Sequence, residues 1–208
     1  MLLIPRIVRV LLAIAFCSIG CFGQASPKRA STLAPATKRY CQQGGGFCFS
    51  YPANWKMLAQ YGDGAIVAPQ QTLDRELWDE VTVATVVGPP AENQPPLSID
   101  QVIQTAMTNM RADDHDPTTL QRQERTVAGL PGQMIRIRYH DQASGRDWIE
   151  QLVFIEGPDQ QIYSVALKGQ PGTIKRLEPA FEAIVRSWKL ESGEDKVGSQ
   201  TSLPEPHH

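Results

Sequence analysis

The spacing of apolar residues along this chain switches between two periods, and each period predicts a different kind of element. Apolar residues at every second position, or β-branched residues on both faces, predict strands. Such segments occur at residues 47–51, 65–68, 80–87, 135–139, 148–155 and 161–167. The last three are joined by short connections containing Gly145 and Gly157. We therefore expect antiparallel neighbours, because parallel strands need a long crossover.

Two other segments repeat their apolar residues at helical spacing. The first follows Ser98, which forms the sequence of a capping box with Gln101, and ends in the acidic run that begins at Asp113. The second runs from about residue 174 to 188, with Thr173 as its expected N-cap. Because each helix has one apolar face, we expect an α+β fold: an α/β/α sandwich in which a central antiparallel sheet is flanked by helices.

The two ends of the chain lack this periodicity. Residues 1–25 have the build of a secretory signal, with basic residues before an apolar run that is too short to span a bilayer. Residues 26–39 predict a flexible linker and residues 191–208 a disordered tail, because both are polar and aperiodic. Residues 40–190 are the expected folded domain.

The sequence leaves two processing routes open. Cleavage after Ala25 would release a secreted protein. Alternatively, Ser18-Ile19-Gly20-Cys21 resembles a bacterial lipobox, which would make Cys21 a lipidated N-terminus. We therefore expect an exported protein, located in the periplasm, on the membrane as a lipoprotein, or outside the cell.

Cys41 and Cys48 are the thiols that remain on either route. We expect a structural disulfide between them, because exported compartments permit disulfides and three glycines in the intervening loop allow a tight reversal. Closing so small a loop stabilises the fold by about 2.5 kcal/mol in the chain-entropy treatment. A zinc site is the alternative, but it needs about four ligands and no histidine lies nearby.

The charge of the chain argues against nucleic acid as a partner. Residues 1–25 hold two arginines and no acidic residue, so the rest of the chain has 18 basic and 22 acidic residues, a net charge of −4. A phosphate-binding surface needs a basic excess. The membrane would then be reached only through a lipid anchor.

The histidines are the residues that an enzyme here would use. His115 and His140 are the two that precede the tail, and no G-x-S-x-G motif accompanies them. His140 beside Asp141 is a conceivable His–Asp couple, but an exposed residue at the mouth of a hairpin is the favoured interpretation. We therefore predict no catalytic residue.

The best metal candidates form one acidic run: Asp113, Asp114, His115 and Asp116. Carboxylates and imidazole suit a divalent cation. Consecutive residues cannot all face one ion without a dedicated loop, so we expect a solvated acidic loop, no bound metal and no cofactor. A partner surface is expected instead at Trp78, in a charged segment, and at the proline-rich loop with Pro89, Pro90, Pro95 and Pro96.

Several apolar and aromatic segments resemble the PsbP/Mog1-like group, which includes photosystem II extrinsic proteins and many bacterial envelope proteins. They are Phe47–Trp55 with its Tyr-Pro-x-x-Trp ending, Val153-Phe154, Ile162–Val165 and the helix end Phe181–Trp188. The resemblance covers about residues 40–190. It implies an α/β/α sandwich and accessory, binding or assembly roles, and no enzyme activity.

These observations lead to one expected function and one alternative. We expect a non-catalytic exported envelope protein that acts as a binding or assembly accessory on an unidentified protein or small ligand. The alternative is a secreted hydrolase or metal-dependent enzyme that uses His115 or His140.

Overall fold

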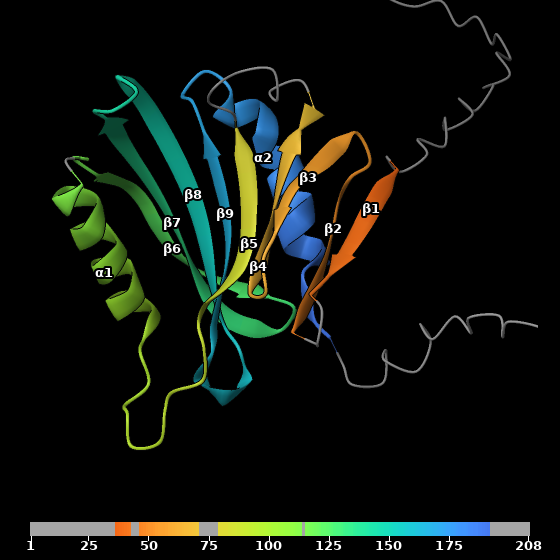
Figure 1. Ribbon diagram of the computed structural model, residues 1–208, viewed down its shortest axis with the longest axis vertical. Helices are drawn as coiled ribbons and strands as arrows, with labels where there is room; N and C mark the ends of the chain where they lie inside the picture. The colour runs from red at the N-terminus through yellow and green to blue at the C-terminus, as the bar shows by residue number, and fades with distance from the viewer. Residues whose placement is uncertain (1–35, 43–45, 71–78, 114, 192–208) are drawn as a thin grey trace, which may run out of the picture. The chain divides into compact units, whose positions relative to one another are not determined.

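The computed structural model describes residues 36–42, 46–70, 79–113 and 115–191. These residues form strands and two α-helices (Figure 1). The strands are β1 (Thr37–Cys41), β2 (Phe47–Pro52), β3 (Trp55–Gln60), β4 (Gly64–Pro69), β5 (Glu80–Val87), β6 (Thr118–Val127), β7 (Leu130–Asp141), β8 (Arg146–Glu156), β9 (Ile162–Gly169) and β10 (Lys189–Leu190). The helices are α1 (Ile99–Ala112) and α2 (Ile174–Ser187).

Most strands belong to one antiparallel sheet of seven, in the order β3-β4-β5-β9-β8-β7-β6. The prediction that the segments now called β7, β8 and β9 are antiparallel neighbours is confirmed. Their register matters for the site. Glu150 of β8 lies opposite Ile137 on one side and Lys168 on the other, and Lys168 in turn lies opposite Glu80 of β5.

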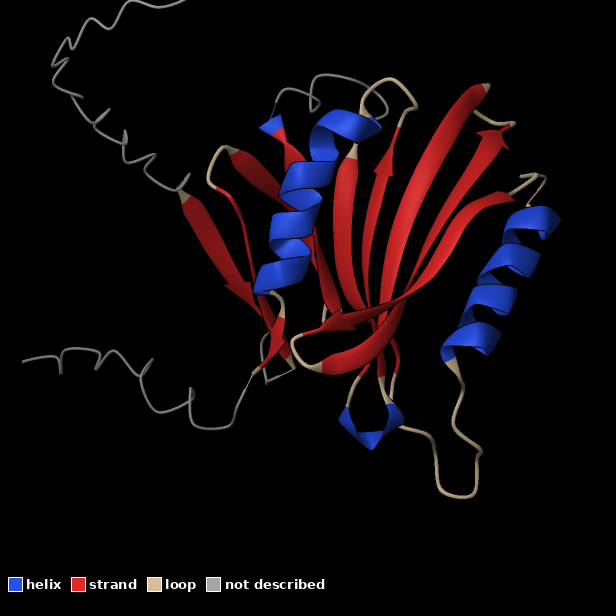
Figure 2. Ribbon diagram, turned by 180° about the vertical axis from the view of Figure 1, so that it is seen from behind, coloured by secondary structure: helices blue, strands red, loops and turns tan. Residues whose placement is uncertain are grey.

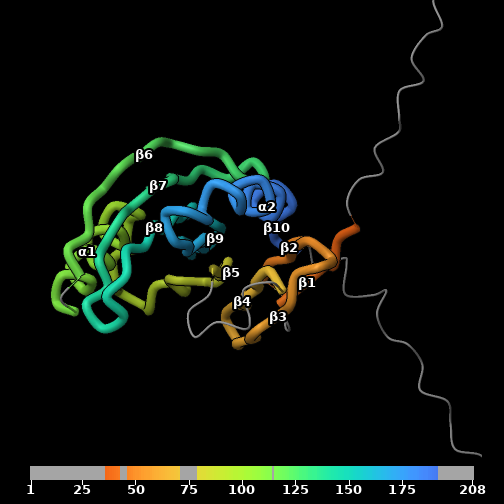
Figure 3. The backbone as a smooth tube through the Cα atoms, turned by 90° about the horizontal axis from the view of Figure 1, so that it is seen from above, coloured from red at the N-terminus to blue at the C-terminus, as the bar shows by residue number. Residues whose placement is uncertain are grey.

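The two helices cover opposite faces of this sheet. Residues at alternate positions of the strands pack with α2 in the larger apolar cluster, which includes Val153, Val165 and Phe181. The intervening positions, such as Ile137 and Phe154, pack with α1 in a smaller cluster. Figure 2 shows α2 lying across the sheet, and Figure 3 shows α1 beside β7 and β8, far along the sheet from α2. The predicted α+β sandwich is confirmed.

A second, three-stranded sheet in the order β1-β2-β10 was not predicted. Phe47, Phe49 and Tyr51 point from β2 into the larger apolar cluster, as their alternation predicts. Ser187 at the end of α2 fixes this sheet to the helix: its hydroxyl accepts from the Ser50 N–H at 2.9 Å and donates to the Ser50 carbonyl at 3.2 Å.

Helix capping follows the sequence at α1 but not at α2. The capping box of α1 is formed, because the Ser98 hydroxyl accepts from the Gln101 N–H and the Gln101 side chain accepts from the Ser98 N–H. Thr173 precedes α2 as predicted, yet its hydroxyl makes no cap hydrogen bond. It donates instead to Asp79 Oδ1 at 2.8 Å, and the buried Asp79 also accepts from the Gln170 N–H at 3.1 Å.

One boundary and two strands differ from the sequence-based expectation. β1 begins at Thr37, inside the predicted linker, because residues 37–41 pair with β2. β3 and β6 are strands that the apolar pattern does not reveal. The expected signal, most of the linker and nearly all of the tail, residues 192–208, lie outside the described residues. Neither helix of the described part is long and apolar enough to cross a membrane.

Candidate functional site

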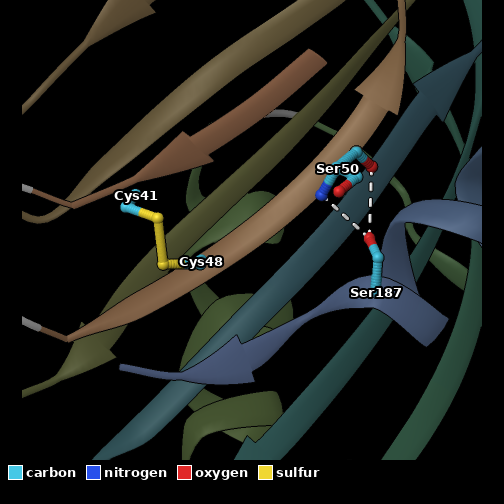
Figure 4. The surroundings of a disulfide bond; sticks show 4 residues. All are labelled: Cys41, Cys48, Ser50 and Ser187. Atoms are coloured by element: carbon cyan, nitrogen blue, oxygen red, sulfur yellow. Dashed lines mark hydrogen bonds between the residues drawn. A yellow bond between two sulfur atoms is a disulfide. The ribbon is translucent and has the colours of Figure 1, made fainter. Parts of the chain in front are cut away.

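The predicted disulfide between Cys41 and Cys48 is present. The two cysteines lie directly opposite each other on β1 and β2, which explains the pairing (Figure 4). Together with Glu191 they are the only three potential ligand groups that converge within the described ranges. Because the two sulfur atoms are bonded to each other, this trio offers no pair of thiolates to a metal ion.

The structure gives His140 a different acidic neighbour from the one that the sequence suggests. Its Nδ1 lies 2.9 Å from Asp147 Oδ1 across the β7–β8 hairpin, and Asp147 also accepts from Arg138. Asp141 instead accepts from Ser144 and from the Ala143 N–H. His140 and Asp147 are both exposed. The His–Asp couple therefore exists, but between other residues and in open solvent.

The acidic run after α1 is divided between solvent and the sheet. Asp113 and Asp116 are exposed, as expected of a solvated loop, and Asp114 lies outside the described residues. His115 departs from that expectation because it is partly buried, with its ring centroid 5.2 Å from that of Tyr139. Its Nδ1 is buried and has no hydrogen-bond partner.

The expected partner surface is only partly described. Trp78 lies outside the described residues. Pro89, Pro95 and Pro96 are exposed and Pro90 is half-buried. Pro96 and the exposed Leu97 line a surface groove of about 300 Å³ next to the turn before β9. No partner is present, so the role of this surface stays a prediction.

A group of polar and aromatic side chains gathers on the α1 face of the sheet, and we call it the Glu150 cluster: His115, Tyr139, Trp148, Glu150 and Lys168. Tyr139 donates its hydroxyl to Glu150 Oε1 at 2.8 Å. The Lys168 ammonium lies 4.8 Å from the centre of the Trp148 ring. The antiparallel register, with Tyr139 opposite Trp148 and Glu150 opposite Lys168, brings these residues together from three strands.

Burial dominates the electrostatics of this cluster. It raises the pKa of Glu150 above the usual range of a glutamate, although the Tyr139 hydrogen bond and the Lys168 charge act in the opposite direction. The pKa of Tyr139 is raised as well, first by burial and then by the neighbouring Glu150. The cluster therefore holds its acidic protons more tightly than the same groups would in water.

An apolar cavity of about 50 Å³ lies between α1 and the sheet and reaches Glu150. The residues that line it, apart from Glu150, are Ile103, Ala106, Met107, Met110, Ile135, Ile137, Leu152 and Phe154. Glu150 is thus the only ionisable group in that wall among the described residues. Apolar walls with a few convergent polar groups are typical of small-molecule sites, and this cavity has that composition at a much smaller volume than the roughly 300–1,000 Å³ of such sites.

Sequence reasoning missed this site. The sequence also allows a basic patch of Arg136, Arg138, Arg146 and Lys168 on one sheet face, although ordinary outward-facing polar residues are its favoured interpretation. In the structure Arg136 pairs with Glu178 of α2, whereas Lys168 lies on the opposite, α1 face. Glu150 carries a signal that could have been used: it is an acidic residue at a half-buried position, and apolar residues lie two positions away on either side of it, Trp148 and Leu152. Buried carboxyl groups are rare without a partner, so such a position is a candidate for function.

Comparisons with known proteins identify the fold. No family model and no curated protein matches the chain. Among solved structures, it is similar to cyanobacterial PsbP (CyanoP) from Synechocystis sp. PCC 6803, with a TM-score of 0.53 and 12% identity over 83% of this chain and 99% of that one. It is also similar to LpqN, involved in cell envelope biogenesis of Mycobacterium tuberculosis, with a TM-score of 0.53 and 14% identity over 76% of this chain and 91% of that one.

Both similarities cover most of each chain and agree with the sandwich described above. At such low identity they establish the fold and leave the partner and the chemistry open. This chain has the PsbP/Mog1-like fold.

Proposed function

We propose that this protein is a non-catalytic exported protein of the cell envelope, and that it works as an accessory module by binding through the α1 face of its sheet. The cavity that ends at Glu150 is the observation that carries the proposal. Its wall combines apolar side chains from α1, β7 and β8 with one hydrogen-bonding group. Such a wall is suited to recognising a molecule, and among the described residues it contains no serine, threonine, cysteine or lysine nucleophile.

The chemistry around the cavity favours binding over turnover. Nucleophilic catalysis needs a nucleophile within hydrogen-bond reach of a base. In the described part of the chain, no serine, threonine or cysteine lines the cavity, and neither His115 nor His140 forms a hydrogen bond with such a residue. The similarity to a protein involved in cell envelope biogenesis supports the envelope location that residues 1–25 predict.

Photo-crosslinking in living cells tests this proposal. A small diazirine amino acid is placed at Met110, which lines the cavity, and at Thr105, which is exposed on the same helix. We expect a discrete adduct, with a protein or a small molecule, at position 110 and little or none at position 105. Intact mass of the recovered chain identifies the adduct and also reports the processed N-terminus.

The contradicting result concerns both binding and activity. The enzyme alternative is favoured if neither position gives an adduct and the purified protein hydrolyses an ester or peptide. The enzyme alternative is established if the hydrolysis is lost in a His140→Ala or His115→Ala variant whose circular dichroism and melting temperature are unchanged. An adduct of equal yield at positions 105 and 110 also rules out the α1 face as the binding site.

A further inference from the structure

The volume of the cavity beneath α1, its apolar lining and the charge of Glu150 together specify a class of ligand. We propose that it binds a small alkylamine group, in which a short hydrocarbon chain lies between α1 and the sheet and a protonated amine meets Glu150. This inference rests on the proposed binding function and names the chemistry of its ligand.

The size of the cavity limits the apolar part of the ligand. At about 50 Å³ it has roughly a third of the volume of an engineered 150 Å³ cavity that accepts benzene. A short alkyl chain therefore fits, whereas a ring system does not. Met107 and Met110 form part of the wall, and methionine side chains adapt readily to an inserted group.

The charges around the cavity select an amine over an acid. Glu150 is the ionisable group of the wall, and one of its oxygens already accepts from Tyr139. Lys168 and, when protonated, His115 are the cations that act on Glu150, while Glu80 adds a second carboxylate and Asp141 a third acidic charge near Tyr139. An incoming carboxylate would meet this acidic excess, whereas an ammonium group would offset it.

The neighbouring unpaired atoms do not change this selection. Trp148 Nε1 and His115 Nδ1 are buried and have no hydrogen-bond partner, so this face contains polar atoms that a bound molecule or water can satisfy. The Trp148 N–H is uncharged. His115 contacts Tyr139 and its charge, when present, would favour the ionised form of Glu150.

Calorimetric titration of the chain purified from cells tests the inference with three probes of equal length: n-propylamine, 1-propanol and propanoate. We expect propylamine to bind at least tenfold more tightly than propanol, and propanoate to bind more weakly than propanol. The amine preference should increase as the pH rises and Glu150 ionises, with His115, Tyr139, Lys168 and Glu80 as the titratable groups that act on it.

Two variants assign the preference to its residue. Glu150→Gln keeps an oxygen that accepts from Tyr139 but removes the charge, so propylamine and propanol should bind equally. Glu124→Gln removes an exposed glutamate of β6 and should leave the tenfold difference intact. The inference is overturned if amine and alcohol bind the unchanged protein equally, if propanoate binds more tightly than they do, or if no probe binds. It is also overturned if the amine preference survives Glu150→Gln. The crosslink expected at position 110 does not depend on these results, so the two proposals can fail separately.

Discussion

At the residue scale, Glu150 and its neighbours show where the sequence was informative and where it was not. β8 has apolar residues on both faces, so its sequence places Glu150 on a covered face, yet it does not say which residues of β7 and β9 lie beside it. That information is in the strand register, which the apolar pattern constrains only through the choice of face. The disulfide was predictable because the two cysteines are close in sequence. The pairing of His140 with Asp147 was not, because it crosses a hairpin.

Removing the charge of Glu150 is expected to stabilise the fold at neutral pH. Burial raises the pKa of Glu150, so the folded state binds its proton more tightly than the unfolded chain does. Stability is therefore greatest below the ordinary glutamate pKa and falls as the pH rises through the raised value. Glu150→Gln should raise the melting temperature at pH 7 more than at pH 4. An equal or opposite effect at the two pH values would show that Glu150 ionises without cost.

The ion pair between Arg125 and Glu182 has the opposite pH dependence. Arg125 donates from both terminal nitrogens to the two Glu182 oxygens, at 3.0 and 2.5 Å, and so connects β6 to α2. The hydrogen bonds from Arg125 lower the pKa of Glu182. Its contribution is present above the ordinary glutamate pKa and is lost as the pH falls through the lowered value.

Glu182→Gln should therefore cost about 1 kcal/mol near pH 7, a value limited by partial exposure to solvent. Urea denaturation at several pH values measures this cost, which should shrink as the medium becomes acidic. A cost that stays constant down to pH 3 would mean that packing, rather than charge, explains the loss.

At the element scale, the strongly patterned segments were predictable and the polar ones were not. Both helices and the inner strands have one or two covered faces, so their apolar period is clear. β6 is an edge strand in which eight of ten residues are exposed, and this leaves no alternation to detect. The turn from β6 to β7 did contain a sequence signal, because it includes Gly129. In the structure Ala128 and Gly129 both have positive φ, the conformation of a tight two-residue hairpin.

The N-cap of α1 should contribute measurably to the stability of the helix that covers the cavity. The Ser98 hydroxyl satisfies the Gln101 N–H, which would otherwise lack a partner at the helix start. Ser98→Ala should lower the free energy of unfolding by about 1 kcal/mol, whereas Ser98→Asp should retain most of it. Hydrogen exchange should report faster opening of α1 in the alanine variant. Equal exchange in both variants would contradict a role for the cap.

The disulfide should stabilise the three-stranded sheet through the unfolded state. Cys41 and Cys48 close a short loop between β1 and β2, and losing that constraint should cost about 2.5 kcal/mol. Chemical denaturation of the Cys41→Ala/Cys48→Ala double variant measures this cost, and the reduced unchanged protein serves as its control. A loss below about 1 kcal/mol in both samples would contradict the chain-entropy explanation.

At the scale of the whole molecule, the sandwich was predictable because its two helices and its apolar strands must cover one another. The division into a seven-stranded and a three-stranded sheet was not predictable, because the sequence of β2 is that of any strand with a buried face and does not show which sheet it joins. In the structure α2 contacts both β2 and β9, and Phe47 of β2 also packs against Tyr163 of β9, so the buried side of α2 joins the two sheets in one apolar cluster. The other helix, α1, covers a smaller apolar cluster and borders the cavity.

Methyl NMR of the methionines tests most directly whether this protein acts by binding at the α1 face. Met107 and Met110 line the cavity, whereas Met57 and Met134 pack with the larger apolar cluster on the opposite face. On addition of the molecule captured at position 110, the account predicts that the Met107 and Met110 signals shift and that those of Met57 and Met134 do not. Shifts at Met57 or Met134 with Met107 and Met110 unchanged would contradict it.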